Sequence, residues 1–117
     1  MISIFLKKEG VYPKNRILDF LIVYQEFDYS LKDIAKFAKV SYSSMKNLKN
    51  ELINDKWIIL TRVVGKAQMY KLNVNSKKVS KFIDFYWSVV DSDTEERPKA
   101  EYFNSGSAAV SISAKNI

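Results

Sequence analysis

Polar and cationic side chains without carboxylates are concentrated between Lys39 and Asn50. This segment holds three lysines and no acidic residue, whereas an ordinary solvated helix face mixes both charge signs. Asparagine can pair bidentately with adenine, lysine reaches the acceptor atoms of guanine, and serine donates to bases or phosphates. The pattern therefore predicts readout of double-stranded DNA by one helix face. The candidate residues are Tyr42, Ser43, Ser44, Lys46, Asn47, Lys49 and Asn50.

Side chains for catalytic and metal chemistry are scarce. The 117 residues include no cysteine and no histidine, which removes thiolates, the commonest metal ligand and the usual proton carrier near neutral pH. No nucleophile–base pair or pair of carboxylates can be assembled from the sequence. We therefore expect a protein that is not an enzyme and that needs no cofactor or metal.

The net charge of +6 favours a polyanionic partner such as nucleic acid. No run of apolar residues is long enough to span a bilayer, and the N-terminal residues do not follow the order of a secretory signal. We expect a cytoplasmic protein with no membrane partner.

Charge and composition both change near residue 90. Residues 1–90 carry 16 Lys and Arg against 8 Asp and Glu, a net charge of +8, whereas residues 91–117 carry a net charge of −2. We expect an N-terminal arm over residues 1–12 and a folded domain over residues 13–90. The acidic and then Ser- and Ala-rich tail, residues 91–117, is expected to be disordered.

Three helices are predicted in the first half of this domain. Pro13 suits the first turn of a helix with one apolar face. Ser30 begins a capping box that ends at Asp33, and Ser41 caps the next helix after a turn of three or four residues. Two helices so closely joined are typical of a helix-turn-helix, which presents its second helix to the major groove.

The apolar period changes from 3.6 to 2 after the third helix. Segments 57–62 and 68–74 are predicted strands, and Gly65 supplies the positive φ that a tight hairpin turn needs. A last helix follows Ser76. The order α-α-α-β-β-α predicts a mainly α fold with one β-hairpin, in the α+β class.

Two segments resemble a known family of DNA-binding proteins. The run Ser30–Met45, followed by Glu51-Leu52 and Trp57-Ile58, resembles the winged helix-turn-helix pattern of prokaryotic transcriptional regulators. Thr61–Asn73 is similar to the wing of archaeal members, in which a Gly-Lys-Ala turn precedes a Tyr-Lys-Leu-Asn strand.

The resemblance covers residues 14–90 and implies sequence-specific binding of double-stranded DNA, commonly by a homodimer. It places Ser43, Ser44, Lys46, Asn47 and Asn50 in recognition positions and residues 62–66 in the wing.

Two turns depart from the family pattern. Lys56 stands where glycine is common after the recognition helix, so Lys56 must adopt positive φ or its loop must differ. The usual glycine of the helix-turn-helix turn is also absent and is replaced near Lys39.

Cations outside the third helix extend the predicted DNA surface. Arg62 and Lys66 lie around the hairpin turn and can reach phosphates or the minor groove, and Lys32 and Lys36 lie on the bracing helix. The alternative for the hairpin is that its charges only keep an edge strand from aggregating.

Aromatic and aliphatic residues on the last helix exceed what a 90-residue core needs. We expect a homodimer that pairs through Phe82, Phe85, Tyr86 and Val89, and the alternative is that this stripe packs inside one monomer. A protein partner could also bind the N-terminal arm or the C-terminal tail.

Three functions are open at this point. The first is a transcriptional regulator, and the second is a plasmid or viral partition protein that spreads along its DNA site. The third is a winged helix that binds proteins and not DNA.

Overall fold

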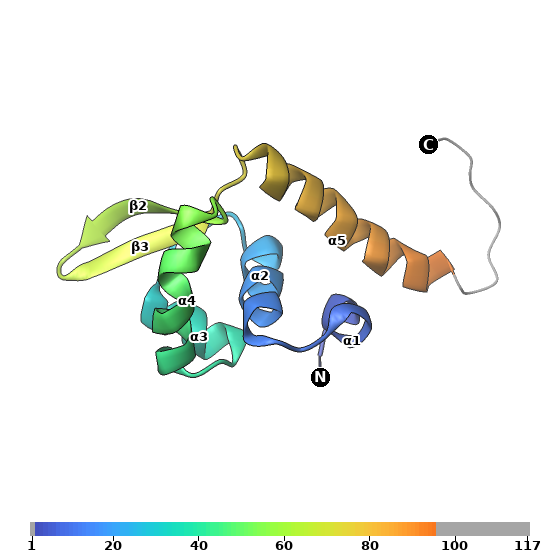
Figure 1. Cartoon of the computed structure of the whole chain (residues 1–117), viewed down its shortest axis with the longest axis horizontal. Coiled ribbons are helices and arrows are strands. Elements are labelled where there is room, and N and C mark those ends of the chain that lie inside the picture. The colour runs from blue at the N-terminus through green and yellow to red at the C-terminus, as the bar shows by residue number, and fades with distance from the viewer. Residues whose placement is uncertain (1, 96–117) are drawn as a thin grey trace.

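The computed structural model describes residues 2–95 (Figure 1). It contains the six predicted helices and strands and two further elements, a short N-terminal helix and a short strand. The α+β class is confirmed, but the sheet has three strands because a short strand precedes the second predicted helix. The tail predicted to be disordered spans residues 91–117; residues 91–95 are helical, and residues 96–117 lie outside the described residues. The elements are α1 (Ile4–Glu9), α2 (Pro13–Val23), β1 (Tyr29–Ser30), α3 (Leu31–Ala38), α4 (Tyr42–Asn54), β2 (Ile58–Val64), β3 (Ala67–Leu72) and α5 (Lys77–Glu95).

Serine caps begin α3 and α4, as the sequence predicts. The Ser30 hydroxyl accepts a hydrogen bond from the Asp33 N–H at 3.2 Å, and the Ser41 hydroxyl accepts one from the Ser44 N–H at 3.0 Å. Each cap satisfies a backbone donor that has no partner inside the helix. The caps therefore fix where the two helices begin on either side of their short turn.

The sheet is antiparallel with strand order β1-β3-β2, so β2 is an edge strand. The register pairs Tyr29 with Tyr70 and Ile58 with Leu72, and it shifts between Leu60 and Arg62 because Thr61 is an extra, bulged residue. Gly65, with φ of 63°, is the first of two residues in the hairpin turn.

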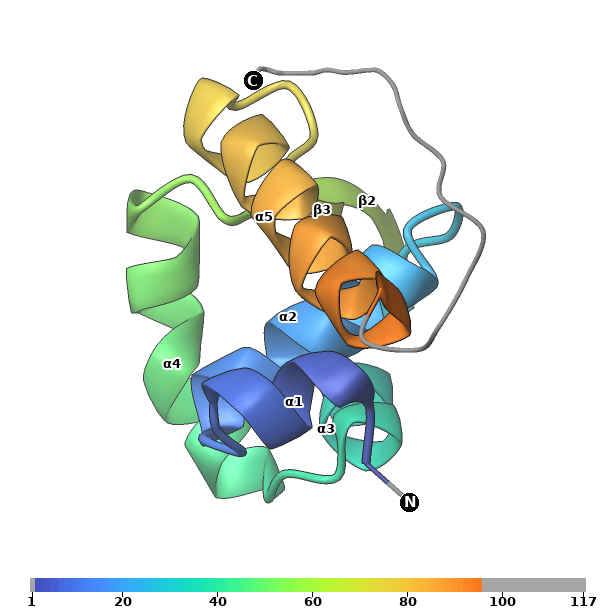
Figure 2. The same cartoon turned by 90° about the vertical axis from the view of Figure 1, so that its right-hand side faces the viewer.

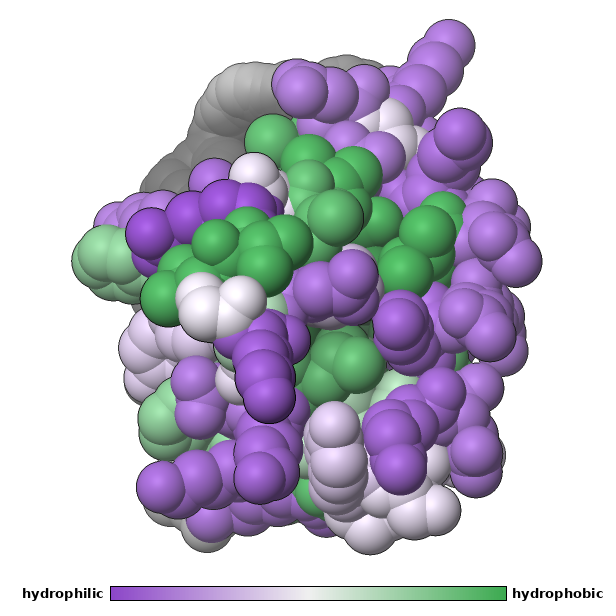
Figure 3. Space-filling view, turned by 90° about the vertical axis from the view of Figure 1, so that its left-hand side faces the viewer, coloured by the Kyte–Doolittle hydropathy of each residue, from purple (hydrophilic) through white to green (hydrophobic). Residues whose placement is uncertain are grey.

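The hairpin extends away from the helices, and its edge strand is exposed along most of its length (Figure 1). Four apolar side chains of β2 are between 38% and 58% exposed: Ile59, Leu60, Val63 and Val64. Figure 3, which views the molecule from the hairpin side, shows hydrophobic atoms among hydrophilic ones on this face.

Residues expected as an N-terminal arm form α1, which belongs to the core. Phe5 and Leu6 are buried, and the Phe5 ring lies 5.7 Å from the Phe82 ring and 4.8 Å from the Tyr86 ring. Figure 2 shows α1 beside the C-terminal end of α5. The capping serine of α1, Ser3, also donates a hydrogen bond to Asp19 on α2 at 2.8 Å. Residues of the expected arm therefore contribute to the packing of the domain.

The helix α5 continues to Glu95, past the boundary expected at residue 90, and much of its apolar face is internal. Tyr86 and Val89 are 2% and 8% exposed, and the Tyr86 hydroxyl donates to Asp19 at 2.7 Å. These two residues, predicted for dimerisation, are buried by their own protomer because α1 covers this part of α5. Phe82 is partly buried against the same core, and Phe85 is 45% exposed.

None of the helices in residues 2–95 is long and apolar enough to cross a lipid bilayer.

Candidate nucleic-acid interface

An open groove lies between α4, the start of α3 and the β2–β3 hairpin. It brings together six of the eleven residues predicted to bind DNA: Lys32, Tyr42, Lys46, Lys49, Asn50 and Lys66. The other lining residues were not among the predicted DNA contacts; they are Ser30, Leu31, Val63, Ala67 and Gln68. Gln68 adds an amide that can donate or accept hydrogen bonds beside the lysines.

The groove is cationic. Four of the eleven lining residues are lysines and none is acidic. Lys46 Nζ lies 5.0 Å from the centre of the Tyr42 ring, a cation–π arrangement that holds the ammonium group near the start of α4. A concave surface with charge of one sign concentrates an oppositely charged ligand, so the groove suits a polyanion.

Helix α4 is positioned by its buried face. Met45 and Leu52 are completely buried, and Leu48 packs partly against the same core. Burial of this stripe turns the opposite face of the helix outward, where Ser43 and Asn47 are exposed next to the groove without lining it. Ser44 is half-buried, and its hydroxyl accepts a hydrogen bond from the Ser41 hydroxyl, so part of its bonding capacity is used in the cap.

The first carboxylates of this region, near the C-terminal end of α4, are paired with lysines. Glu51 lies 3.1 Å from Lys14 Nζ, and Asp55 lies 2.9 Å from Lys78 Nζ. The hydrogen bond from Lys78 is the main cause that lowers the pKa of Asp55 below its ordinary value. These pairs weaken the negative field that the two acids would otherwise add beside the groove.

Lys36 lies outside the groove. Its Nζ is 5.7 Å from the centre of the Phe37 ring on the same helix, and the residue is exposed. It remains available to a ligand larger than the groove.

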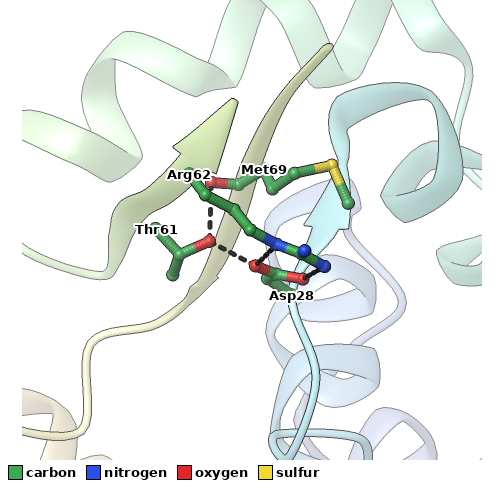
Figure 4. A network of polar contacts seen from close by, with 4 residues as sticks. All are labelled: Asp28, Thr61, Arg62 and Met69. Atoms are coloured by element: carbon green, nitrogen blue, oxygen red, sulfur yellow. Dashed lines mark hydrogen bonds and ion pairs between the residues drawn. The ribbon is translucent and has the colours of Figure 1, made fainter. Parts of the chain in front are cut away.

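Arg62 is also outside the groove, and its guanidinium pairs with Asp28 (Figure 4). Arg62 Nε donates to Asp28 Oδ2 at 2.9 Å and Arg62 Nη2 donates to Asp28 Oδ1 at 3.1 Å, which makes a forked ion pair. Hydrogen bonds from Arg62 and Thr61 lower the pKa of Asp28 to about 2, and the Asp28 carboxylate raises the pKa of Arg62. The arrangement found for Arg62 therefore differs from the free phosphate contact that the sequence suggested.

Solved structures of DNA-binding proteins share this arrangement of elements. One is a homodimeric winged helix-turn-helix DNA-binding domain from Mycobacterium bovis, a possible ArsR-family transcriptional regulator, with 17% identity, a TM-score of 0.56 and coverage of 75% of this chain and 76% of that one. Another is MepR, a transcription regulator of the Staphylococcus aureus multidrug efflux pump MepA, with 18% identity, a TM-score of 0.59 and coverage of 78% and 66%. The fold is a winged helix-turn-helix.

A third similar structure is ZitR of Lactococcus lactis in complex with DNA, with 16% identity, a TM-score of 0.52 and coverage of 76% of this chain and 62% of that one. No protein-family model matches the sequence, and no curated protein matches it. The likeness of residues 61–73 to archaeal wings stays a prediction.

In the winged helix-turn-helix fold, α3 and α4 correspond to the helix pair, α4 takes the place called the recognition helix, and the β2–β3 hairpin takes the place called the wing. The two turns that flank the recognition helix keep their left-handed geometry without glycine, since Lys39 has φ of 62° and Lys56 has φ of 68°. The positive φ of Lys56 confirms the first of the two possibilities for that lysine, and the wing follows the recognition helix through this turn.

Proposed function

We propose that this chain is a sequence-specific double-stranded DNA-binding protein that acts as a transcriptional regulator. In this proposal the recognition helix enters the major groove, and the wing contacts the phosphate backbone or the minor groove. The observation that carries it is the groove between recognition helix and wing, with its four lysines and no acidic side chain. Similar folds include a transcription regulator and a protein in complex with DNA, which supports the same class of ligand.

The exposed face of the recognition helix has suitable chemistry for base readout. Asn47 and Asn50 carry amides that match adenine, and Lys46 can reach guanine from the same face. Ser43 is exposed near the helix N-terminus, where backbone N–H groups favour phosphate. Lys32 and Lys66 stand on opposite walls of the groove, so we assign them to phosphates on either side of the bases.

Base readout is tested by substitution on the recognition helix. We expect Lys46→Ala and Asn47→Ala each to weaken binding to a selected DNA site by about 1–3 kcal/mol if each contacts a base. Fluorescence anisotropy with a duplex obtained by selection from random DNA measures the loss. Lys81→Ala, which removes an exposed lysine from α5, is the matched control. Wild-type affinity in both helix variants would contradict the assigned surface.

Footprinting over a protein titration separates the alternative functions. A regulator protects one or two discrete sites at all concentrations. Protection that spreads with concentration would instead support a partition or accessory protein. If the protein does not bind DNA, or if its affinity for DNA does not depend on salt, the alternative of a winged helix that binds proteins remains.

We also propose that the active form is a homodimer. Tyr86 and Val89 are internal, so the proposed contact is centred on the exposed predicted residue of the same helix, Phe85, at 45% exposure. Two-fold pairing of α5 helices would present two recognition helices to half-sites about one DNA turn apart. The similar domain from Mycobacterium bovis is homodimeric, which supports this arrangement.

Sedimentation tests the dimer directly. We expect a dimer at micromolar concentration and a monomer after Phe85→Asp. Phe27→Asp, which changes a 64% exposed aromatic residue before β1, should leave the dimer intact. A monomeric wild-type protein would refute the dimer without bearing on DNA binding.

A further inference from the structure

The contact between Asp28 and Arg62 joins two parts of the chain that are 34 residues apart in sequence. Asp28 lies in the loop between α2 and β1, and Arg62 lies on β2, at the edge of the sheet. The carboxylate reaches across β3 to its partner, so the pair links the body of the domain to the outer strand of the wing (Figure 4). None of the residues assigned to bases or phosphates above takes part in this link.

The strand register places Arg62 on the face of the sheet opposite to the groove. Directly paired residues share a face, and successive residues alternate between faces. The pair Val63–Gln68 lines the groove, and the Tyr70 hydroxyl donates to Gln68 Oε1 at 3.0 Å on the same face, so the pair Arg62–Met69 between them lies on the other face. Ser30, which pairs with Met69, borders the groove where the chain turns from β1 into α3. Asp28 is on that face too, because the next residue, Tyr29, pairs with the buried Tyr70. A guanidinium on this outer face does not point toward DNA held in the groove.

The ion pair acts at the point where the strand bends. Thr61 is the extra residue of the β-bulge, and bulges bend a strand and increase its twist. The Thr61 hydroxyl donates to Asp28 Oδ2, and its oxygen also lies 3.2 Å from the Met69 carbonyl oxygen. Asp28 therefore holds both the bulged residue and the residue after it, where the wing leaves the body.

The wing tip lies beyond this point. Val63 and Lys66 stand past the bulge and form the hairpin wall of the groove, opposite Lys46 and Lys49 of the recognition helix. A change in the bend at Thr61 would change the distance between the two walls. The position of Lys66 relative to the recognition helix thus depends on the Asp28 contacts.

We propose that Asp28 is a positioning residue that fixes the angle of the wing by holding Arg62 and Thr61, and that Arg62 is not a DNA contact. This inference rests on the proposed function for its effect on DNA binding, but the position of the wing can be measured without DNA. The competing arrangement is one in which Arg62 leaves Asp28 and binds a phosphate.

The first test measures the wing in the free protein. Because the chain has no cysteine, spin labels can be attached at Val64→Cys on the wing and Ser88→Cys on α5, which are both exposed positions, and the measurement needs no DNA. Labelled protein is diluted with unlabelled protein so that distances within one protomer dominate. We expect one narrow distance distribution, which broadens in Asp28→Asn and not in the charge-matched control Glu26→Gln. An equally narrow distribution in Asp28→Asn would overturn the proposal.

The second test measures binding to the selected duplex by anisotropy over a salt series. We expect Asp28→Asn and Arg62→Met each to weaken binding by about twofold to fivefold, the bias that an exposed ion pair gives to an equilibrium. The double variant should be no weaker than either single one, because both remove the same link. The charge-swapped variant Asp28→Arg with Arg62→Asp, which keeps the net charge, should recover part of the loss.

The competing arrangement makes the opposite prediction for Asp28. If Arg62 binds a phosphate, Asp28→Asn frees the guanidinium and tightens binding, and Arg62→Met lowers the salt slope by about 0.9. Either result would overturn the proposal. A wild-type protein that does not bind DNA would refute the proposed function alone, since the distance measurement still decides the role of Asp28.

Discussion

The salt dependence of DNA binding can count the lysines that contact phosphates. Four lysines line the groove of each protomer: Lys32, Lys46, Lys49 and Lys66. Lys46 is assigned to a base, which leaves three lysines as candidate phosphate contacts. Each neutralised phosphate changes the slope of log affinity against log salt by about −0.9, so three contacts give a slope of about −2.7 per protomer. Between 50 mM and 200 mM salt, affinity per protomer should then fall by about 40-fold.

Anisotropy with a fixed duplex at five or more salt concentrations gives this slope. We expect Lys49→Ala to make the slope shallower by about 0.9, because Lys49 faces the groove, whereas the α5 variant Lys81→Ala should keep the wild-type slope. A wild-type slope near −1 would refute the reasoning, because most of the groove lysines would then not contact phosphates. An equal effect of both variants would show that net charge, and not the groove, governs binding.

Three further predictions concern stability. Tyr86→Phe should lower the free energy of unfolding by about 1–2 kcal/mol in urea denaturation, because the hydrogen bond to Asp19 is lost in a buried site; unchanged stability would exclude a contribution from this bond. Lys39→Gly should raise the free energy of unfolding by about 0.5–1 kcal/mol, since glycine adopts the left-handed conformation without steric cost; a lower melting temperature would contradict this. The pKa of Asp28 is about 2 in the folded protein against 3.8 ordinarily, so its ion pair with Arg62 stabilises the fold above pH 4, and this contribution is lost as the pH falls from about 4 to 2. Melting temperatures of wild type and Asp28→Asn should therefore differ at neutral pH and converge near pH 2, and a constant difference over this range would be evidence against the assignment.

Local signals in the sequence predicted the helix pair and the hairpin. The Ser30 and Ser41 caps act within three residues of themselves, and the turn at Gly65 depends on a single backbone angle, so short patterns contain the necessary information. The left-handed geometry at Lys56 was one of two possibilities that followed from its position in the family pattern, whereas the same geometry at Lys39 was not predicted.

Contacts between distant residues were beyond the sequence patterns. In the sequence, Arg62 is one more cation of the wing, and nothing in its neighbourhood indicates a partner. Its partner Asp28 is too far away in sequence for any spacing rule to link the two residues. The apolar stripe on α5 is equally consistent with a core and with a dimer contact. Tyr86 and Val89 belong to the core because α1 packs against this part of α5. Helix α1 has only six residues, too few for an apolar pattern to show where it packs.

The exposed apolar side chains of the edge strand β2 set a practical limit on solution conditions. The net charge of +6 keeps copies of the chain apart by mutual repulsion, and added salt screens that repulsion over shorter and shorter distances. An unpaired strand edge with Ile59, Leu60, Val63 and Val64 exposed is a template for pairing with another strand once repulsion is weak. High salt, the usual means of suppressing non-specific DNA binding, thus favours self-association through the wing.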